Sequence, residues 1–193
     1  MSVSMTKYVL HGGLAKDKAY KQDFFDEIVS TLSQKSISVL YLSARINSEK
    51  KGEKTKQKQE EFRSFLPKKD ITVVMVDENP EKFLDQTHAA DIVYFGGGDT
   101  QQILNLLRQI PLDILSQHLQ NKIVVGVSAG ANALSKYYFS AHRQQIEEGL
   151  GVLPIKVFCH YTEEKEQLLA NLEAYGEQLT SFALPEDYFV IIQ

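Results

Sequence analysis

A serine between two glycines is the first sign of chemistry in this sequence. Residues 126–130 read Gly-Val-Ser-Ala-Gly, at the end of the apolar run 123–127 and directly before Ala-Asn-Ala-Leu at 131–134. Gly-x-Ser-x-Gly between a strand and a helix is typical of a nucleophile elbow, a sharp and strained turn whose flanking glycines make room for its neighbours. We therefore predict Ser128 as a nucleophile at the carboxyl end of a strand. The alternatives are a structural turn or a phosphate-binding helix start.

A second glycine cluster could supply hydrogen bonds to the same reaction. Residues 96–98 are all glycine, follow the apolar run 92–95 and precede Asp99 and Thr100. Backbone N–H groups in this loop, together with that of Ala129 at a helix start, can stabilise an oxyanion. The spacing is not that of a dinucleotide-binding loop. Capping of the next helix by Asp99 or Thr100 is the simpler role and is compatible with the first.

A serine nucleophile requires a base, and the sequence offers five histidines. His160 closes an apolar run, which places it at the carboxyl end of a strand, where active sites of open α/β sheets form. We predict His160 as the base. His11 also ends a strand and is expected to line the same cleft, and His142 lies in an irregular stretch and stays open as a base. The two remaining histidines, predicted as surface or capping residues, are His88 and His118.

A carboxylate beside the histidine would complete a catalytic triad by orienting the imidazole. Glu186 follows the apolar run 182–184 and is expected at the same edge of the sheet, with Asp187 as the competing acid. Cys159 precedes His160 directly. Because neighbouring residues of a strand point to opposite faces, we predict a buried packing thiol there rather than a second nucleophile.

Short apolar runs alternate with amphipathic stretches, as in α/β proteins whose parallel strands are joined by helices. Five runs rich in β-branched and aromatic residues predict buried strands, at 8–10, 39–42, 71–76, 92–95 and 123–127. Apolar stripes predict helices at 24–32 and 103–110. Further strand-like runs follow at 155–158, 182–184 and 189–192, and one short helix is predicted at 168–172. The segment 49–69 interleaves acidic and basic residues, which predicts a solvated helix rather than a nucleic-acid-binding patch.

Composition narrows the class of protein. The 193 residues, 43% hydrophobic and 24% charged, fit a single domain over 1–193 with a sizeable core. A formal net charge of −4 disfavours nucleic acid and anionic membranes as partners. The single cysteine excludes internal disulfides and multi-cysteine zinc sites, and no signal peptide or membrane span is recognisable. We expect a cytoplasmic protein that is a monomer or a homodimer.

Four segments together resemble the peptidase E (aspartyl dipeptidase) and cyanophycinase family of serine peptidases. They are residues 94–101, residues 126–132, residues 149–154 followed by His160, and residues 184–186. Their order and spacing match the family over nearly the whole chain, which is more specific than a lone Gly-x-Ser-x-Gly. The resemblance implies a three-layer α/β/α fold with a mostly parallel central sheet, like that of class I glutamine amidotransferases and flavodoxin-like proteins. Ser128 would stand where those amidotransferases carry cysteine.

The resemblance also implies a role for each candidate residue. Ser128 would be the nucleophile, His160 the base and Glu186 the acid, and the N–H groups of Gly97 and Ala129 would form the oxyanion hole. The order serine, histidine, acid along the chain differs from that of α/β-hydrolases. The serine would form an acyl-enzyme that water hydrolyses, with neither metal nor cofactor. The residues expected at the substrate are Gly98, Asp99, Asn132 and Arg143.

A small peptide is the expected substrate, and the resemblance implies an exopeptidase similar to dipeptidase E. In peptidase E an acidic residue shortly after the nucleophile lies near the substrate amine, whereas residues 135–143 here are aromatic and basic. This departure puts aspartyl specificity in question and makes Arg143 a candidate for binding a substrate carboxylate. The alternatives are a relative that binds peptides or amino acids without cleaving them, and an esterase or amidase with the same nucleophile.

Overall fold

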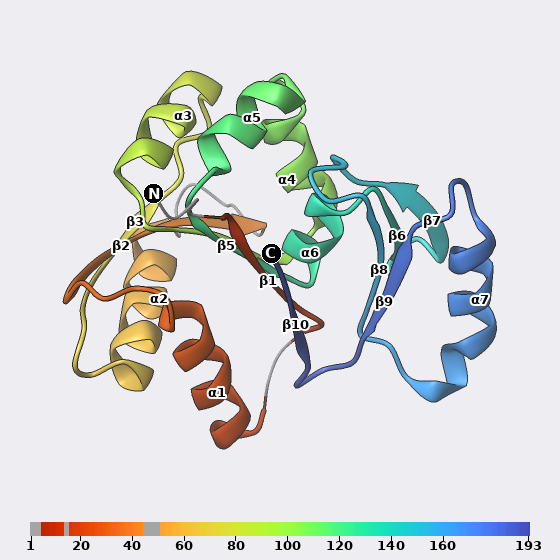
Figure 1. The fold of residues 1–193 in the computed structure, drawn as a ribbon, viewed down its shortest axis with the longest axis horizontal. Helices are drawn as coiled ribbons and strands as arrows, with labels where there is room; N and C mark the ends of the chain where they lie inside the picture. The colour runs from red at the N-terminus through yellow and green to blue at the C-terminus, as the bar shows by residue number, and fades with distance from the viewer. Residues whose placement is uncertain (1–4, 14–15, 45–50) are drawn as a thin grey trace.

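A six-stranded sheet forms the centre of the molecule (Figure 1). The computed structural model describes residues 5–13, 16–44 and 51–193, so residues 49–50 of the charged segment lie outside the described residues. The strand order is β10-β1-β5-β4-β2-β3, and all neighbours are parallel except β10, which pairs antiparallel with β1. The strands are β1 (Lys7–His11), β2 (Ser36–Ala44), β3 (Asp70–Met75), β4 (Ile92–Gly98), β5 (Ile123–Val127) and β10 (Phe189–Ile192).

Helices cover both faces of this mostly parallel sheet, as the α/β pattern of the sequence predicts (Figure 1). One face carries α1 (Lys18–Val29) and α2 (Lys51–Phe65), packed on the strands through an aromatic cluster that includes Phe25 and Phe62. The other face carries α3 (Pro80–Ala89), α4 (Thr100–Leu107), α5 (Leu112–Leu119) and α6 (Ala129–Leu134). No helix in the described part of the chain is long and apolar enough to cross a membrane.

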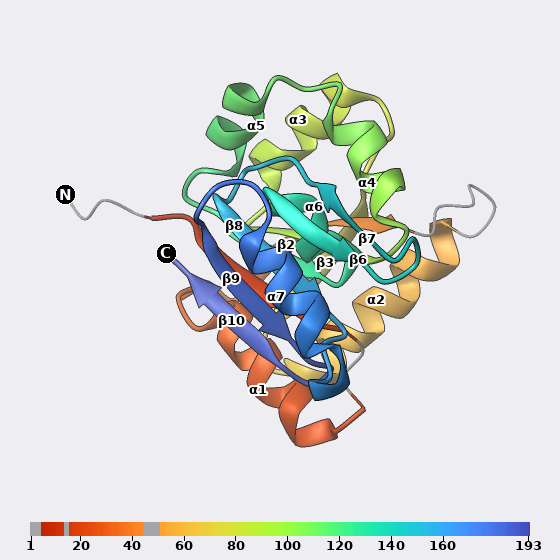
Figure 2. The same ribbon diagram turned by 90° about the vertical axis from the view of Figure 1, so that its right-hand side faces the viewer.

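A second, smaller sheet lies beside the first, and the sequence did not predict it as a separate unit (Figures 1 and 2). Its order is β7-β6-β8-β9, and α7 (Glu166–Ala174) packs on its outer side after a short 3-10 turn at Glu163–Lys165. The inner side of β8 and β9 joins the core of the large sheet through Val157, Cys159 and Leu184. Its strands are β6 (Tyr137–Ser140), β7 (Gln145–Glu148), β8 (Ile155–Cys159) and β9 (Thr180–Leu184).

The charged segment forms a helix, α2, as predicted, but one side of this helix is buried rather than solvated. Phe62 is fully buried against the sheet, and the side chain of Lys58, one turn earlier, is only 15% exposed. Residues four apart share one face of a helix, so the buried position of Phe62 carries Lys58 inward as well. Other charged residues of α2 keep the predicted exposure, as at Lys56, whose side chain is 79% exposed.

Candidate active site

Ser128 stands directly after β5, in the centre of the large sheet, with φ 50° and ψ −105°. Residues other than glycine rarely adopt a positive φ, and its occurrence in a strand-to-helix turn is the conformation expected of a nucleophile elbow. The N–H of Ser128 donates to the carbonyl oxygen of His11 at 2.9 Å. Gly130 is required close by, because a Cβ atom there would lie 2.1 Å from the carbonyl oxygen of Phe95. The turn is therefore fixed by its own backbone contacts.

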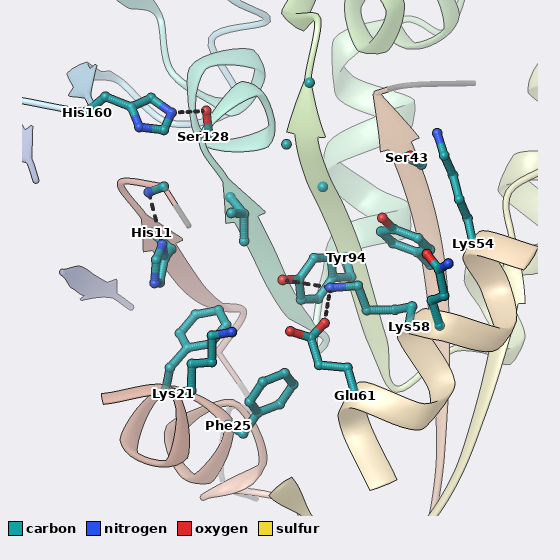
Figure 3. Close-up of a pocket in the computed structure, with 18 residues that line it drawn as sticks. His11, Lys21, Phe25, Ser43, Lys54, Lys58, Glu61, Tyr94, Ser128 and His160 are labelled. Atoms are coloured by element: carbon teal, nitrogen blue, oxygen red, sulfur yellow. Dashed lines mark hydrogen bonds and ion pairs between the residues drawn. The ribbon is translucent and has the colours of Figure 1, made fainter. Parts of the chain in front are cut away.

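His160 approaches Ser128 from the smaller sheet, where it follows β8. Its Nε2 atom lies 2.8 Å from Ser128 Oγ (Figure 3). The backbone of His160 also has a positive φ of 54°, and its N–H donates to the carbonyl oxygen of Gly12 at 3.0 Å. A Cβ atom on Gly13 would lie 2.3 Å from the imidazole Cε1. The two glycines after β1 thus leave room for the imidazole and tie it to the large sheet.

Glu186 lies where the chain passes from β9 to β10, between the two sheets. Its Oε1 atom is 3.3 Å from His160 Nδ1, and both side chains are partly exposed. The competing acid, Asp187, instead accepts a hydrogen bond from the backbone N–H of Lys16 at 2.8 Å. Serine, imidazole and carboxylate therefore form a chain of contacts with the geometry of a triad.

The other histidines and the cysteine do not take the place of His160, and His142, which lines a cavity beside Ser128, forms no hydrogen bond with it. His11 is 3% exposed, its Nδ1 accepts from the N–H of Gly13, and burial lowers its pKa to about 4. His88 and His118 pack against each other on α3 and α5, and neither lines a cavity that reaches Ser128. Cys159 is buried, its Sγ lies 3.5 Å from the carbonyl oxygen of Ser128, and burial raises its pKa. A buried neutral thiol has little nucleophilicity.

The glycine cluster lies beside the nucleophile, although it differs from the predicted loop. Gly96, Gly97 and Gly98 are the last residues of β4 rather than part of a separate turn. A Cβ atom on Gly97 would lie 3.7 Å from Ser128 Cβ, and Ala129 is the first residue of α6, whose first-turn N–H groups have no partner within the helix. Asp99 caps α4 by accepting from the N–H of Gln101 at 2.9 Å. The oxyanion-hole roles of Gly97 and Ala129 remain predictions.

Two cavities meet at Ser128 and His160, one on each side. The first, which we call the lysine pocket, has a volume of about 570 Å³ and lies between the large sheet and helices α1 and α2 (Figure 3). The second, the asparagine pocket, has a volume of about 520 Å³ and lies between α4, α6 and the strands β6 and β7. A bound molecule attacked by Ser128 could extend into both.

The asparagine pocket contains all four residues predicted to bind substrate: Gly98, Asp99, Asn132 and Arg143. Asn132 is 8% exposed, its Nδ2 donates to Thr100 Oγ1 at 3.4 Å, and its Oδ1 has no partner among the described residues. Arg143 forms an ion pair of 2.9 Å with Glu147, which the sequence analysis missed. Burial alone would raise the pKa of Glu147, but hydrogen bonds from Tyr138, Gln145 and Arg143 lower it. The pocket therefore contains a carboxylate, although residues 135–143 of the sequence contain none.

The lysine pocket contains residues that the sequence analysis did not select. Lys58 Nζ lies 2.6 Å from Glu61 Oε2, 3.5 Å from the hydroxyl of Tyr94 and 4.5 Å from the centre of the Tyr94 ring. Burial opposes the charge, but Tyr94 and Glu61 together raise the pKa of Lys58, so it is an ammonium ion at neutral pH. The spacing of Lys54, Lys58 and Phe62, each one helical turn apart, was the available signal for this face.

Comparisons with known proteins identify the family and the fold. The model of a family described as Peptidase family S51 matches residues 8–193. A crystal structure of a peptidase from an acI-B1 Actinobacterium is similar, with a TM-score of 0.63 and 16% identity over 100% of this chain and 85% of that one. A putative peptidase E protein from Listeria monocytogenes EGD-e has a TM-score of 0.67 and 14% identity over 97% of this chain and 94% of that one. No curated protein matches the chain.

Proposed function

Because the chain belongs to peptidase family S51 and is thus a serine peptidase, we propose that it hydrolyses small peptides, as an exopeptidase similar to dipeptidase E, through Ser128, His160 and Glu186. The observation that carries the assignment of these residues is the 2.8 Å contact between Ser128 Oγ in its elbow and His160 Nε2. The two pockets that meet at this contact have the volume of small-molecule sites, which favours short peptides over folded proteins.

The mechanism follows from the positions of these groups. His160 Nε2 accepts the proton of Ser128 as the hydroxyl oxygen attacks the scissile carbonyl carbon, and the N–H groups of Gly97 and Ala129 stabilise the oxyanion. The protonated imidazole then donates to the leaving amine, which departs and leaves an ester on Ser128. A water molecule, deprotonated by the same imidazole, hydrolyses that ester. Glu186 accepts from His160 Nδ1–H, which keeps Nε2 free to accept the serine proton and stabilises the imidazolium.

A dipeptide-library hydrolysis assay, with N-terminal Asp members included, tests this proposal. The wild-type protein is compared with Ser128→Ala and His160→Ala, and with Ser64→Ala, an exposed serine of α2, as the matched control. Loss of the nucleophile or of the base should lower kcat by about 10⁴-fold or more, and the control should leave it unchanged. Tight peptide binding without turnover by a folded wild type would instead support a binding protein, and turnover of esters alone would support an esterase.

A further inference from the structure

One end of the lysine pocket is positively charged, and the proposed chemistry at Ser128 makes no use of that charge. Lys21, Lys54 and Lys58 line the pocket, and Glu61 is the one carboxylate among its described lining residues. His11, which also lines it, is neutral at neutral pH because burial lowers its pKa to about 4. The pocket therefore attracts a negatively charged group.

Lys58 is built to hold such a group. Its side chain is 15% exposed, and its ammonium forms hydrogen bonds to Glu61 and to the Tyr94 hydroxyl and lies near the rings of Tyr94 and Tyr41. An ammonium ion has three N–H donors, so one donor is left for a ligand. Lys21 projects into the same space from α1, and its side chain forms no hydrogen bond or ion pair with any residue that the structure describes (Figure 3).

The depth of the pocket limits what can reach Lys58. Tyr94, which contacts Lys58, pairs with Val125 across β4 and β5, three residues before Ser128. At a rise of 3.3 Å per residue this offset is about 10 Å. An extended peptide advances at most about 3.3–3.6 Å per residue. The Tyr94 side chain stands off the sheet toward α2, so its hydroxyl and Lys58 lie farther from Ser128 than this offset. After about 3 Å of contact at each end is subtracted, a carboxylate on Lys58 lies more than one residue from the scissile carbonyl, which a group that extends about two residues can reach.

The charges of the asparagine pocket indicate the direction of the peptide. Asn132 Oδ1 is a buried acceptor without a partner in the described structure. The pocket also contains the carboxylates of Asp99 and Glu147 against one arginine, Arg143, which is paired with Glu147. Acceptors of this kind suit the ammonium group at the N-terminus of a peptide, which lies on the acyl side of the bond. The leaving part then extends into the lysine pocket, toward the ammonium of Lys58.

We propose that the lysine pocket binds the leaving part of the peptide through a carboxylate, which Lys58 holds and Lys21 attracts. This rests on the proposed function, because the scissile bond defines the leaving part. Two groups of the leaving part can place a carboxylate at the distance of Lys58 from Ser128. They are the C-terminal carboxylate of a two-residue leaving part, or the side chain of a glutamate that leaves alone. The rings of Phe24, Phe25 and Tyr41 line the apolar walls along the way.

The test compares peptides with and without each carboxylate. The substrates are Xaa-Gly-Gly against its C-terminal amide, and Xaa-Glu-amide against Xaa-Gln-amide, with every residue at Xaa. The proteins are the wild type, Lys58→Met, Lys21→Met and the control Lys56→Met, which removes an exposed lysine of the same helix. We expect kcat/KM of the wild type to favour the carboxylate by about 10- to 100-fold for at least one pair. Lys58→Met should abolish this preference, Lys21→Met should reduce it, and Lys56→Met should retain it.

The ratio of two peptides in one variant is independent of how much of that variant is folded. Equal rates for both members of both pairs in the wild type, or an unchanged preference in Lys58→Met, would overturn the proposal while peptide hydrolysis itself stands. Calorimetric binding of the same peptides to Ser128→Ala, with and without Lys58→Met, separates the two proposals. If the wild type cleaves nothing but this binding favours the carboxylate through Lys58, the subsite stands and the proposed function fails. Binding without that preference overturns the subsite.

Discussion

Ser128 and His160 both have a positive φ, of 50° and 54°, although neither is glycine. Such conformations cost about 1–3 kcal/mol each and persist where the surroundings determine them. Here the N–H of Ser128 donates to His11, and that of His160 donates to Gly12, so both strained residues are bound to the end of one strand, β1. The strained backbone directs the two side chains toward each other.

The two neighbouring acids give a sharp test at this scale. Glu186 faces His160 Nδ1 at 3.3 Å, whereas Asp187 Oδ1 binds the N–H of Lys16. Glu186→Gln should lower kcat by about 10²- to 10⁴-fold, because the imidazole loses the partner that fixes its tautomer. Asp187→Asn, the matched control, should change kcat less than about threefold. Steady-state kinetics on the preferred peptide checks both, and the reverse ranking would assign the acid to Asp187.

The burial of His11 predicts a pH dependence of stability. Burial lowers its folded-state pKa to about 4 from the usual 6.5, so the unfolded chain binds the proton more tightly. The contribution of neutral His11 is complete above pH 6.5 and is lost as the pH falls toward 4, by about 3 kcal/mol. Urea unfolding at pH 7 and pH 4 should show a larger loss in the wild type than in His11→Asn. Equal losses in the two proteins would contradict the assignment.

Substitutions of two glycines near the site test how far the fold and the activity depend on close backbone approach. A Cβ atom on Gly130 would meet the backbone oxygen of Phe95 at 2.1 Å, and one on Gly13 would meet the His160 ring at 2.3 Å. Gly130→Ala should destabilise the fold by about 3 kcal/mol, because α6 cannot approach β4. Gly13→Ala should instead lower kcat by about 10²-fold, because it displaces the imidazole. Thermal unfolding and kinetics separate the effects.

Gly52→Ala is the control for both substitutions. Gly52 lies in α2, and a Cβ atom there meets nothing within 4 Å. Alanine is favoured over glycine in a helix by about 0.5–1 kcal/mol, so this variant should be slightly more stable and equally active. A similar loss of stability in all three variants would mean that the close contacts do not control the site.

The sequence predicted those elements whose signal is local. The strand β5 has its predicted bounds, and Ser128 forms the expected elbow, because apolar run, turn and helix start are consecutive residues. The division into two sheets was not predictable in this way, since strand pairing joins residues far apart in the sequence. The polar edge strand Gln145–Glu148, which carries Glu147, has no apolar alternation to indicate it. Lys58 was missed because its inward position depends on the burial of Phe62.

At the scale of the whole molecule, the candidate triad spans two sheets that share a core. Val157 and Leu184 of the smaller sheet pack in the same cluster as Val124 and Phe95 of the larger one. A shared core favours cooperative unfolding. We therefore expect peptide hydrolysis, far-UV circular dichroism and the hydrogen-exchange protection of β5 and β8 to be lost at one urea concentration. Earlier loss of protection in β8 would mean that the sheets unfold separately and that 1–193 is not one cooperative unit.

The pairing of β10 with β1 has a consequence for the timing of synthesis. Strand β1 pairs with β10, Phe189–Ile192, which the ribosome adds nearly 180 residues after β1. Glu186 comes into place with that same late segment. A nascent chain can therefore form the serine elbow well before it can hold the acid beside His160. If Glu186 is the acid, we expect the nascent chain to gain full peptidase activity only after this segment has been added.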